Sequence, residues 1–325
     1  MAKTAGVALS SASRVLSGHP DVSEAMRERV LAAAESLGYE PNLLWQGLRS
    51  GSTQTIGVVF RDISSSLISS IALAAERVLQ EHGYSVLLSN TRGLAELDVT
   101  QIRLLDQRRV DGLLVMPNDI QDPETISALE RLRVPFVAID RDLPTKLGGG
   151  AVLIDHAAGV RRAAELLLSL GHRSVGFVAP PASLRPATVV TATLHEVFDP
   201  VGATVRVEIG PFEAEHGAAA MEHLLEGPDP VTAVLSGSSQ MFHGVLGALR
   251  ARGLRIPDDV SVVALEDTPL LSLLEPPFTA VSRHPSLVGE EAAQILLEML
   301  AGANPTARTT PTDFIERRSC APPRS

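Results

Sequence analysis

The chain has 325 residues, 45% of them hydrophobic but only 3% aromatic, and its formal net charge is −10 at pH 7. This length and composition predict a small module plus one or two larger lobes with a mainly aliphatic core. No apolar run reaches the length of a membrane span, Met1 is not followed by a signal peptide, and Cys320 is the only cysteine. We therefore expect a cytoplasmic protein that binds no membrane and has no intrachain disulfide.

The first 40 residues have the pattern of a helix-turn-helix. Gly6 stands where a helix ends and the chain reverses, a position that favours φ > 0. The next helix places Val7, Ala12, Val15 and Leu16 on one face and leaves Leu9, Ser10, Ser11 and Arg14 outside it, as in a recognition helix. A third helix is predicted from about Glu24 to Leu37, with an apolar stripe of Met26, Val30, Ala33, Ala34 and Leu37.

Only Met1 to Ala5 precede the turn, which is too short a segment to form a stable helix by itself. One explanation is that Met1 is an internal codon of a longer reading frame, and the other is that the protein is a shortened, weakened DNA binder. We favour the first. It predicts in-frame upstream codons that encode a capped helix start.

From Thr55 onward, aliphatic strands alternate with amphipathic helices, which predicts parallel sheets covered on both faces. The first helix of this part is predicted from about Leu67 to Glu81. A first series of strands comprises residues 56–60, 86–88, 112–115 and 135–139. A second series is predicted to begin near 152–154 and to continue through 175–178, 205–207, 233–235 and 260–263. Two such series indicate two lobes.

Several blocks and their spacing resemble the LacI/GalR family of transcriptional regulators. In the head these are Ala5-Gly6-Val7, Ser13-Arg14-Val15-Leu16, Val22-Ser23, Arg27-Glu28-Arg29-Val30 and Leu37 to Asn42. In the body they are Arg108 to Leu113, Leu170 to Val175, Gly253 to Val263 and Pro276 to Thr279. The resemblance extends over essentially the whole chain.

The resemblance implies an α/β protein with an N-terminal all-α helix-turn-helix head and two Rossmann-like lobes of the periplasmic-binding-protein-like type. The implied limits are 1–41 for the head, 42–52 for a hinge segment and 53–325 for the effector-binding and dimerisation domain. Lobe one would comprise about 53–153 and 282–310, and lobe two about 154–281 and 311–325.

For DNA, the resemblance assigns base reading to Leu9 and Ser10, and phosphate and base contacts to Ser13 and Arg14, with Ser11 on the same exposed side. The hinge segment would enter the minor groove, with Leu48 wedged between base steps and Asn42 and Trp45 beside it. A packed linker residue is the alternative for Leu48. Residues 1–51 carry five basic and five acidic side chains, so the head is a weak electrostatic ligand for phosphates.

The effector is expected between the lobes, beyond the carboxyl ends of the strands. The polar residues predicted there are Arg61, Ser64, Asp140, Arg141, Asp155, Arg185, Ser238, Ser239 and Glu266. Sugar-binding family members use an arginine, an Asn-Asp pair and an acidic residue; here the matching positions hold Val190, Ser238-Ser239 and Glu266. Losing the arginine fork and the carboxylate removes strong contacts to a polyol, so we expect no simple hexose bound in the usual way.

The expected partners are a double-stranded DNA operator, an unknown small-molecule effector and a second copy of the chain. No cofactor, metal or enzymatic activity is expected, because no phosphate loop, nucleophile elbow or metal-spaced cluster occurs. Helices 67–79 and 287–300 are candidate dimer elements, with core packing as the simpler interpretation. The alternatives are a degenerate regulator with impaired DNA binding, or a small-molecule-binding protein of the cytoplasm or the periplasm.

Overall fold

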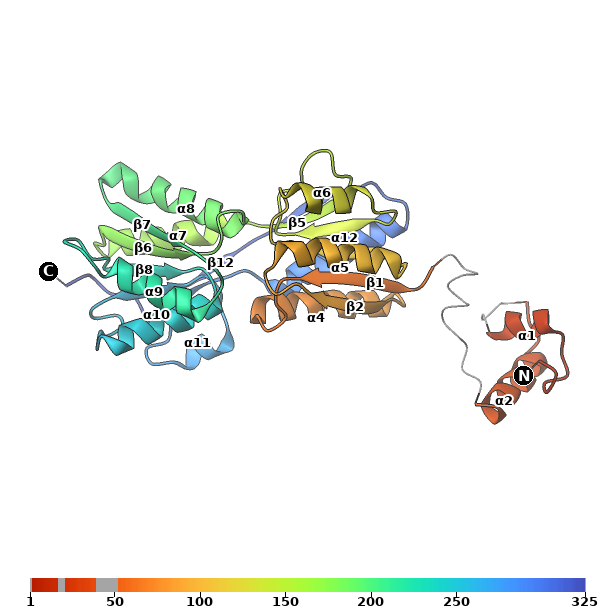
Figure 1. Cartoon of the computed structure of the whole chain (residues 1–325). Coiled ribbons are helices and arrows are strands. Elements are labelled where there is room, and N and C mark those ends of the chain that lie inside the picture. The colour runs from red at the N-terminus through yellow and green to blue at the C-terminus, as the bar shows by residue number, and fades with distance from the viewer. Residues whose placement is uncertain (1, 17–20, 39–51, 325) are drawn as a thin grey trace.

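The computed structural model describes residues 2–16, 21–38 and 52–324 (Figure 1). It contains a small helical N-terminal module and two α/β lobes, each built around a six-stranded sheet. The predicted fold class is therefore confirmed. Within the described ranges, no helix combines the length and the apolar character that a bilayer crossing requires.

The N-terminal module consists of α1 (Leu9–Leu16) and α2 (Glu24–Ser36). Gly6 has a φ of 65°, so the predicted turn in the left-handed region is present. The two helices pack through a small apolar core of Ala5, Ala12, Val15, Val30 and Ala33. Leu37 was expected to continue the apolar stripe of α2. It is 51% exposed, because the helix ends at Ser36 and Leu37 falls at its C-cap.

Lobe one is a parallel sheet in the order β11-β5-β4-β3-β1-β2. Helices α4 and α12 cover one face and α5 and α6 the other, each pair over its own apolar cluster. The strands are β1 (Thr55–Phe60), β2 (Ser85–Asn90), β3 (Gly112–Val115), β4 (Phe136–Ile139), β5 (Gly150–Ile154) and β11 (Ala307–Thr310). The helices are α4 (Ser66–Glu81), α5 (Ala95–Gln107), α6 (Pro123–Glu130) and α12 (Pro285–Leu300).

Lobe two repeats the plan in the order β12-β10-β9-β8-β6-β7, with only β12 antiparallel. Helices α9 and α10 cover one face and α7 and α8 the other. The strands are β6 (Ser174–Ala179), β7 (Thr204–Ile209), β8 (Ala233–Ser236), β9 (Ser261–Ala264), β10 (Thr279–Ser282) and β12 (Asp313–Ile315). The helices are α7 (His156–Ser169), α8 (Arg185–Phe198), η1 (Asp199–Val201), α9 (Ala214–Leu224), α10 (Ser239–Ala251) and α11 (Pro269–Leu273).

The chain passes between the lobes three times, after β5, after β10 and after β11 (Figure 1). The prediction that residues 152–154 begin the second series is wrong, because β5 pairs with β4 and β11 in lobe one. An aliphatic run indicates a buried strand but not its partner. Strand β11, which was not predicted, has the sequence Ala-Arg-Thr-Thr at a sheet edge and lacks such a run.

Asp111 fixes the point at which the chain enters lobe one. Its carboxylate accepts hydrogen bonds from the backbone N–H groups of Thr53 and Gln54, both at 2.8 Å, and from the Ser52 hydroxyl. Thr53 Oγ1 also donates to the Arg109 carbonyl at 2.9 Å. The segment that follows the predicted hinge is therefore anchored near the amino-terminal ends of the lobe one strands.

Candidate DNA-reading helix and effector cleft

Helix α1 presents the predicted DNA-reading side chains away from the core of the head. Leu9 is 79% exposed, Ser10 and Arg14 are exposed, and Ser11 and Ser13 are half-buried. An exposed leucine at the start of a short helix has no packing role in the described head. Three further predicted DNA contacts, Asn42, Trp45 and Leu48, lie outside the described residues.

A cleft between the lobes brings together five of the nine predicted effector residues. Arg61, Asp140, Arg141, Ser238 and Glu266 all line it, from the ends of β1, β4, β8 and β9. The cavity has a volume of about 40 Å³. Such a space holds only a few water molecules, so a ligand much larger than that requires the lobes or the lining side chains to move.

Asp140 is the most constrained residue of the cleft. It is 5% exposed and has a φ of 52°, an uncommon left-handed conformation that aspartate tolerates better than most residues. His156 Nε2 lies 2.9 Å from Asp140 Oδ2, and the backbone N–H of Ile154 donates to Oδ1 at 3.3 Å. Burial alone would raise the pKa of Asp140, but His156, Arg141 and Arg283 together lower it to about 2. The carboxylate is therefore ionised in the cleft.

Arg141 and Glu266 are also held by their surroundings. Arg141 donates from Nε to the Pro117 carbonyl at 2.6 Å and from Nη1 to the Asp140 carbonyl, and burial lowers its pKa to about 10. Glu266 Oε2 accepts a hydrogen bond from the backbone N–H of Ser239 at 3.1 Å and another from its hydroxyl. Both carboxylates of the cleft thus have donors from the protein itself.

The other four predicted residues do not line this cavity. Ser64 is exposed and bonds to Asp62, Asp155 caps α7 through the Ala158 N–H, and Ser239 is bound to Glu266. Arg185 instead contacts lobe one from α8, with Nη1 bonded to Asp142 and Nε 3.5 Å from Asp140 Oδ1. In this structure it is a contact between the lobes.

Sequence reasoning missed Arg283, Phe212 and Gln240, which also line the cleft. Arg283 directly follows β10, so the rule that ligands lie beyond strand ends would have found it. The signals for the other two residues were weaker. Phe212 is a lone aromatic residue two positions after a loop glycine, and Gln240 is a polar residue in the first turn of α10. The Arg61 guanidinium lies over the Phe212 ring at 3.9 Å and joins the two lobes.

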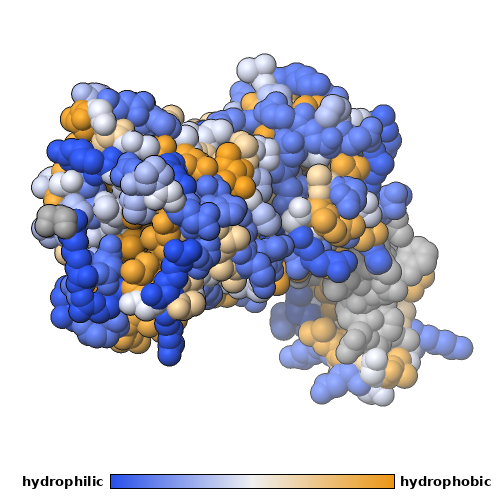
Figure 2. Space-filling view, turned by 60° about the vertical axis from the view of Figure 1, so that its left-hand side comes forward, coloured by the Kyte–Doolittle hydropathy of each residue, from blue (hydrophilic) through white to orange (hydrophobic). Residues whose placement is uncertain are grey.

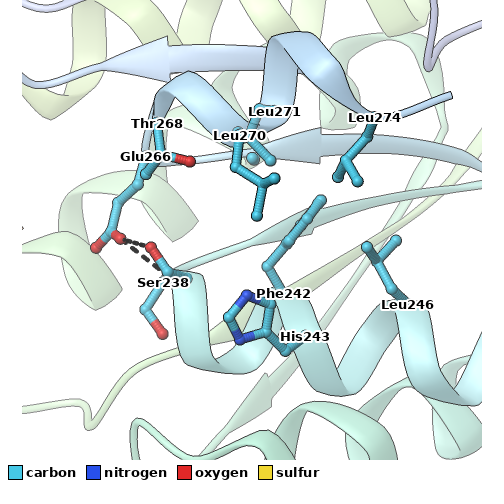
Figure 3. A pocket seen from close by; sticks show the side chains of 11 residues that line it. Ser238, Phe242, His243, Leu246, Glu266, Thr268, Leu270, Leu271 and Leu274 are labelled. Carbon is cyan, nitrogen blue, oxygen red and sulfur yellow. Dashed lines mark hydrogen bonds between the residues drawn. The ribbon is translucent and has the colours of Figure 1, made fainter. Parts of the chain in front are cut away.

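A second cavity, of about 160 Å³, lies in lobe two between α10 and α11 (Figure 3). In Figure 3 the side chains of Leu270 and Leu271 point from α11 towards Phe242 of α10, and Glu266 lies at one end. The lining is mostly apolar. Leu270 and the neighbouring Leu273 are 54% and 80% exposed, so apolar surface continues from this cavity to solvent.

Known proteins match both parts of this arrangement. Residues 1–42 match the model for bacterial regulatory proteins of the lacI family, and residues 164–320 match the periplasmic binding protein-like domain. The transcriptional regulator CelR of Thermobifida fusca is 32% identical over 93% of this chain and 91% of its own length. The chain belongs to the LacI family. It is a DNA-binding transcriptional regulator with a periplasmic-binding-protein-like effector domain.

Other family members support the same assignment. The ribose operon repressor of Escherichia coli is 30% identical over 92% of both chains. The Lac repressor dimer bound to operator superposes with a TM-score of 0.87 and 27% identity, over 98% of this chain and 97% of that one. The family thus spans the head and both lobes.

Replacing Asp140 tests the electrostatics of the cleft through the pH dependence of stability. The folded-state pKa of about 2 lies below the unfolded value, so the stabilisation is fully present above about pH 4 and is lost as the pH falls towards 2. We expect Asp140→Asn to lower the free energy of unfolding by about 2 kcal/mol at pH 6. The deficit should shrink below pH 4. Urea unfolding at pH 6, 4 and 3 measures it, and a deficit that does not depend on pH would contradict the account.

Proposed function

We propose that this regulator is a homodimeric repressor that reads a pseudo-palindromic operator, with a small molecule in the interlobe cleft controlling its affinity for DNA. The observation that carries the proposal is the exposed face of α1, which presents Leu9, Ser10 and Arg14 on the same chain as a two-lobed cleft. A recognition helix of this kind reads base edges in the major groove. Ser11 and Ser13, with Asn42, Trp45 and Leu48 of the hinge, complete the proposed DNA contacts.

The effector is proposed to bind beside Arg61, Asp140, Arg141, Ser238 and Glu266. Arg185 would respond to its presence by leaving Asp140 and Asp142 as the lobes separate. An effector that binds one arrangement of the lobes more tightly shifts the population towards that arrangement and thereby changes operator affinity. Relatives include a CelR–cellobiose complex and a ribose operon repressor. For this chain we propose a ligand other than a simple hexose, because Ser238 and Ser239 stand where sugar-binding members have an Asn-Asp pair.

Exposed apolar residues suggest where two copies meet. On lobe one, Leu73 of α4 is 70% exposed, and Leu87 and Leu88 of β2 are 42% and 38% exposed. On lobe two, α11 exposes Leu270 and Leu273, and Figure 2 shows apolar patches on this lobe within a mostly hydrophilic surface. Large exposed apolar patches mark contact surfaces. The apolar face of α12, the other candidate, packs against α4 and the sheet in the core of lobe one.

The remaining features of the proposal follow from the family. We propose limits of 1–41 for the head, 42–52 for the hinge and 53–325 for the effector and dimerisation domain. The pairing of β5 with β4 and of β10 with β9 supports lobe limits near residues 154 and 282. A cytoplasmic location and the absence of catalysis are part of the same proposal.

A mobility-shift titration with the DNA upstream of the protein's own gene tests this function. The full chain should be used, with random duplex as competitor. A dimer-sized complex that outlasts the competitor supports the proposal. A protein that dimerises and binds small molecules but shows no preference for its upstream DNA would instead be a degenerate regulator.

A further inference from the structure

The cleft contains arginine side chains that use only some of their N–H donors in hydrogen bonds to the protein. Three arginines, Arg61, Arg141 and Arg283, line it against two carboxylates, Asp140 and Glu266. Both carboxylates already accept hydrogen bonds from protein donors, as described above. The cleft therefore has more unfilled positive donors than unfilled acceptors.

Among these three arginines, Arg61 has the most N–H donors without a hydrogen-bond acceptor in the described part of the chain. Among the residues that the structure describes, its guanidinium has no hydrogen-bond acceptor, and its only direct partner is the Phe212 ring at 3.9 Å. Its attraction to Asp62 and Glu266 acts over a distance without a hydrogen bond. A guanidinium carries five N–H donors in a planar fork that matches a carboxylate or a phosphate.

Arg283 adds to this excess of donors, and Gln240 has an unfilled acceptor beside it. Arg283 is 4% exposed, yet in the described part of the chain it makes one hydrogen bond, from Nη2 to the Gly237 carbonyl at 3.1 Å. Its Nη1 lies 3.8 Å from Glu266 Oε1, too far for a hydrogen bond. Gln240 Oε1 is buried without a hydrogen-bond partner among the described atoms. Buried polar atoms without partners are rare in folded proteins and call for an explanation.

We propose that the effector of this regulator carries an anionic group, a carboxylate or a phosphate, that binds Arg61 and Arg283 when the lobes separate. The inference rests on the proposed effector role of the cleft. The anion would accept the donors that the protein leaves unfilled, and a hydroxyl or amine of the same ligand would donate to Gln240. Phe212, released from Arg61, would face the rest of the ligand.

Isothermal titration without DNA tests the inference with three related probes: glucose, gluconate and glucose 6-phosphate. The chain should bind gluconate or glucose 6-phosphate at least 10-fold more tightly than glucose, and the better of the two identifies the anion as carboxylate or phosphate. Binding should weaken as the salt concentration rises. Equal affinity for glucose, or no binding of either anionic probe, overturns the proposal.

Variants at half-buried Arg61 locate the site without disturbing the core. Arg61→Gln should weaken binding of the anionic probe at least 10-fold. Arg61→Lys should weaken binding less, because lysine keeps the positive charge and loses only the planar fork of N–H donors. The matched control is Arg108→Gln, which is exposed near the amino-terminal ends of the lobe one strands, opposite the end that bears Arg61, and should bind as the parent does. An unchanged affinity in Arg61→Gln contradicts the assignment.

The two proposals fail in different ways. Operator binding, measured separately by mobility shift, reports the regulator function and does not depend on the titration. If the chain binds the anion but its operator affinity does not change, the anionic site stands and the proposed control of DNA binding is refuted. If its operator affinity responds only to a neutral ligand, the control of DNA binding stands and the anionic site is refuted.

Discussion

Gly244→Ala should destabilise lobe two by about 2–3 kcal/mol, whereas Gly247→Ala on the same helix should be neutral or stabilising. Both glycines lie on α10, but only Gly244 faces α9 at close range. A Cβ at Gly244 would lie 1.9 Å from the Ala214 carbonyl oxygen and 2.6 Å from the Ala218 nitrogen, so the helices would have to move apart. Overpacking of this kind typically costs about 1–3 kcal/mol, and backbone atoms cannot rotate away.

Gly247 is the matched control, because a Cβ there meets no atom within 4 Å. Alanine in an exposed helical position is favoured over glycine by up to about 1 kcal/mol. Thermal and urea unfolding followed by circular dichroism compare the two variants with the parent. Equal unfolding midpoints for the two variants would show that α9 and α10 do not approach each other as described.

Ser10→Glu should reduce operator affinity at least 100-fold while leaving the head folded. Ser10 is exposed in the first turn of α1, where a carboxylate favours the helix through its dipole. In the complex the same carboxylate would face base edges and phosphates, and repulsion there removes about 3 kcal/mol or more of binding free energy. Fluorescence anisotropy with labelled operator measures the loss.

The control for Ser10→Glu is Ala32→Glu, which adds the same charge to an exposed position of α2. It should lower operator affinity much less, because only a long-range repulsion is added. If the two variants lose affinity equally, net charge of the head accounts for binding and α1 is not the reading helix. Circular dichroism of both variants confirms that the head remains helical.

Most of the fold could be predicted because it depends on local patterns. Aliphatic runs such as Gly112 to Val115 and the stripe of the helix from Ser66 to Glu81 mark their elements directly. The pairing of β5 could not be predicted, since Gly150–Ile154 has the composition of any buried strand and its partners are distant in sequence. Strand β11 was missed for the opposite reason, because an edge strand needs no apolar run.

The cleft was predicted in part, through the rule that ligands lie beyond strand ends. Arg61, Asp140 and Glu266 follow strands and line the cavity, but Ser64 and Asp155 also follow strands and bond locally instead. Which of two such residues faces the cleft depends on the backbone just after the strand, as the left-handed φ of Asp140 illustrates. Arg283 directly follows β10 and the same rule could have found it, whereas Phe212 reaches the cleft from a loop through a tertiary contact that no local pattern encodes.

Selection from a pool of random duplexes is the most direct test of the central claim, that α1 reads DNA and the two-lobed body positions two copies of it. After several rounds with the full chain, the account predicts enrichment of a pseudo-palindrome with two related half-sites, as a two-fold dimer requires. Ser10→Glu should fail to enrich that sequence. A pool that remains random for the full chain would contradict the account.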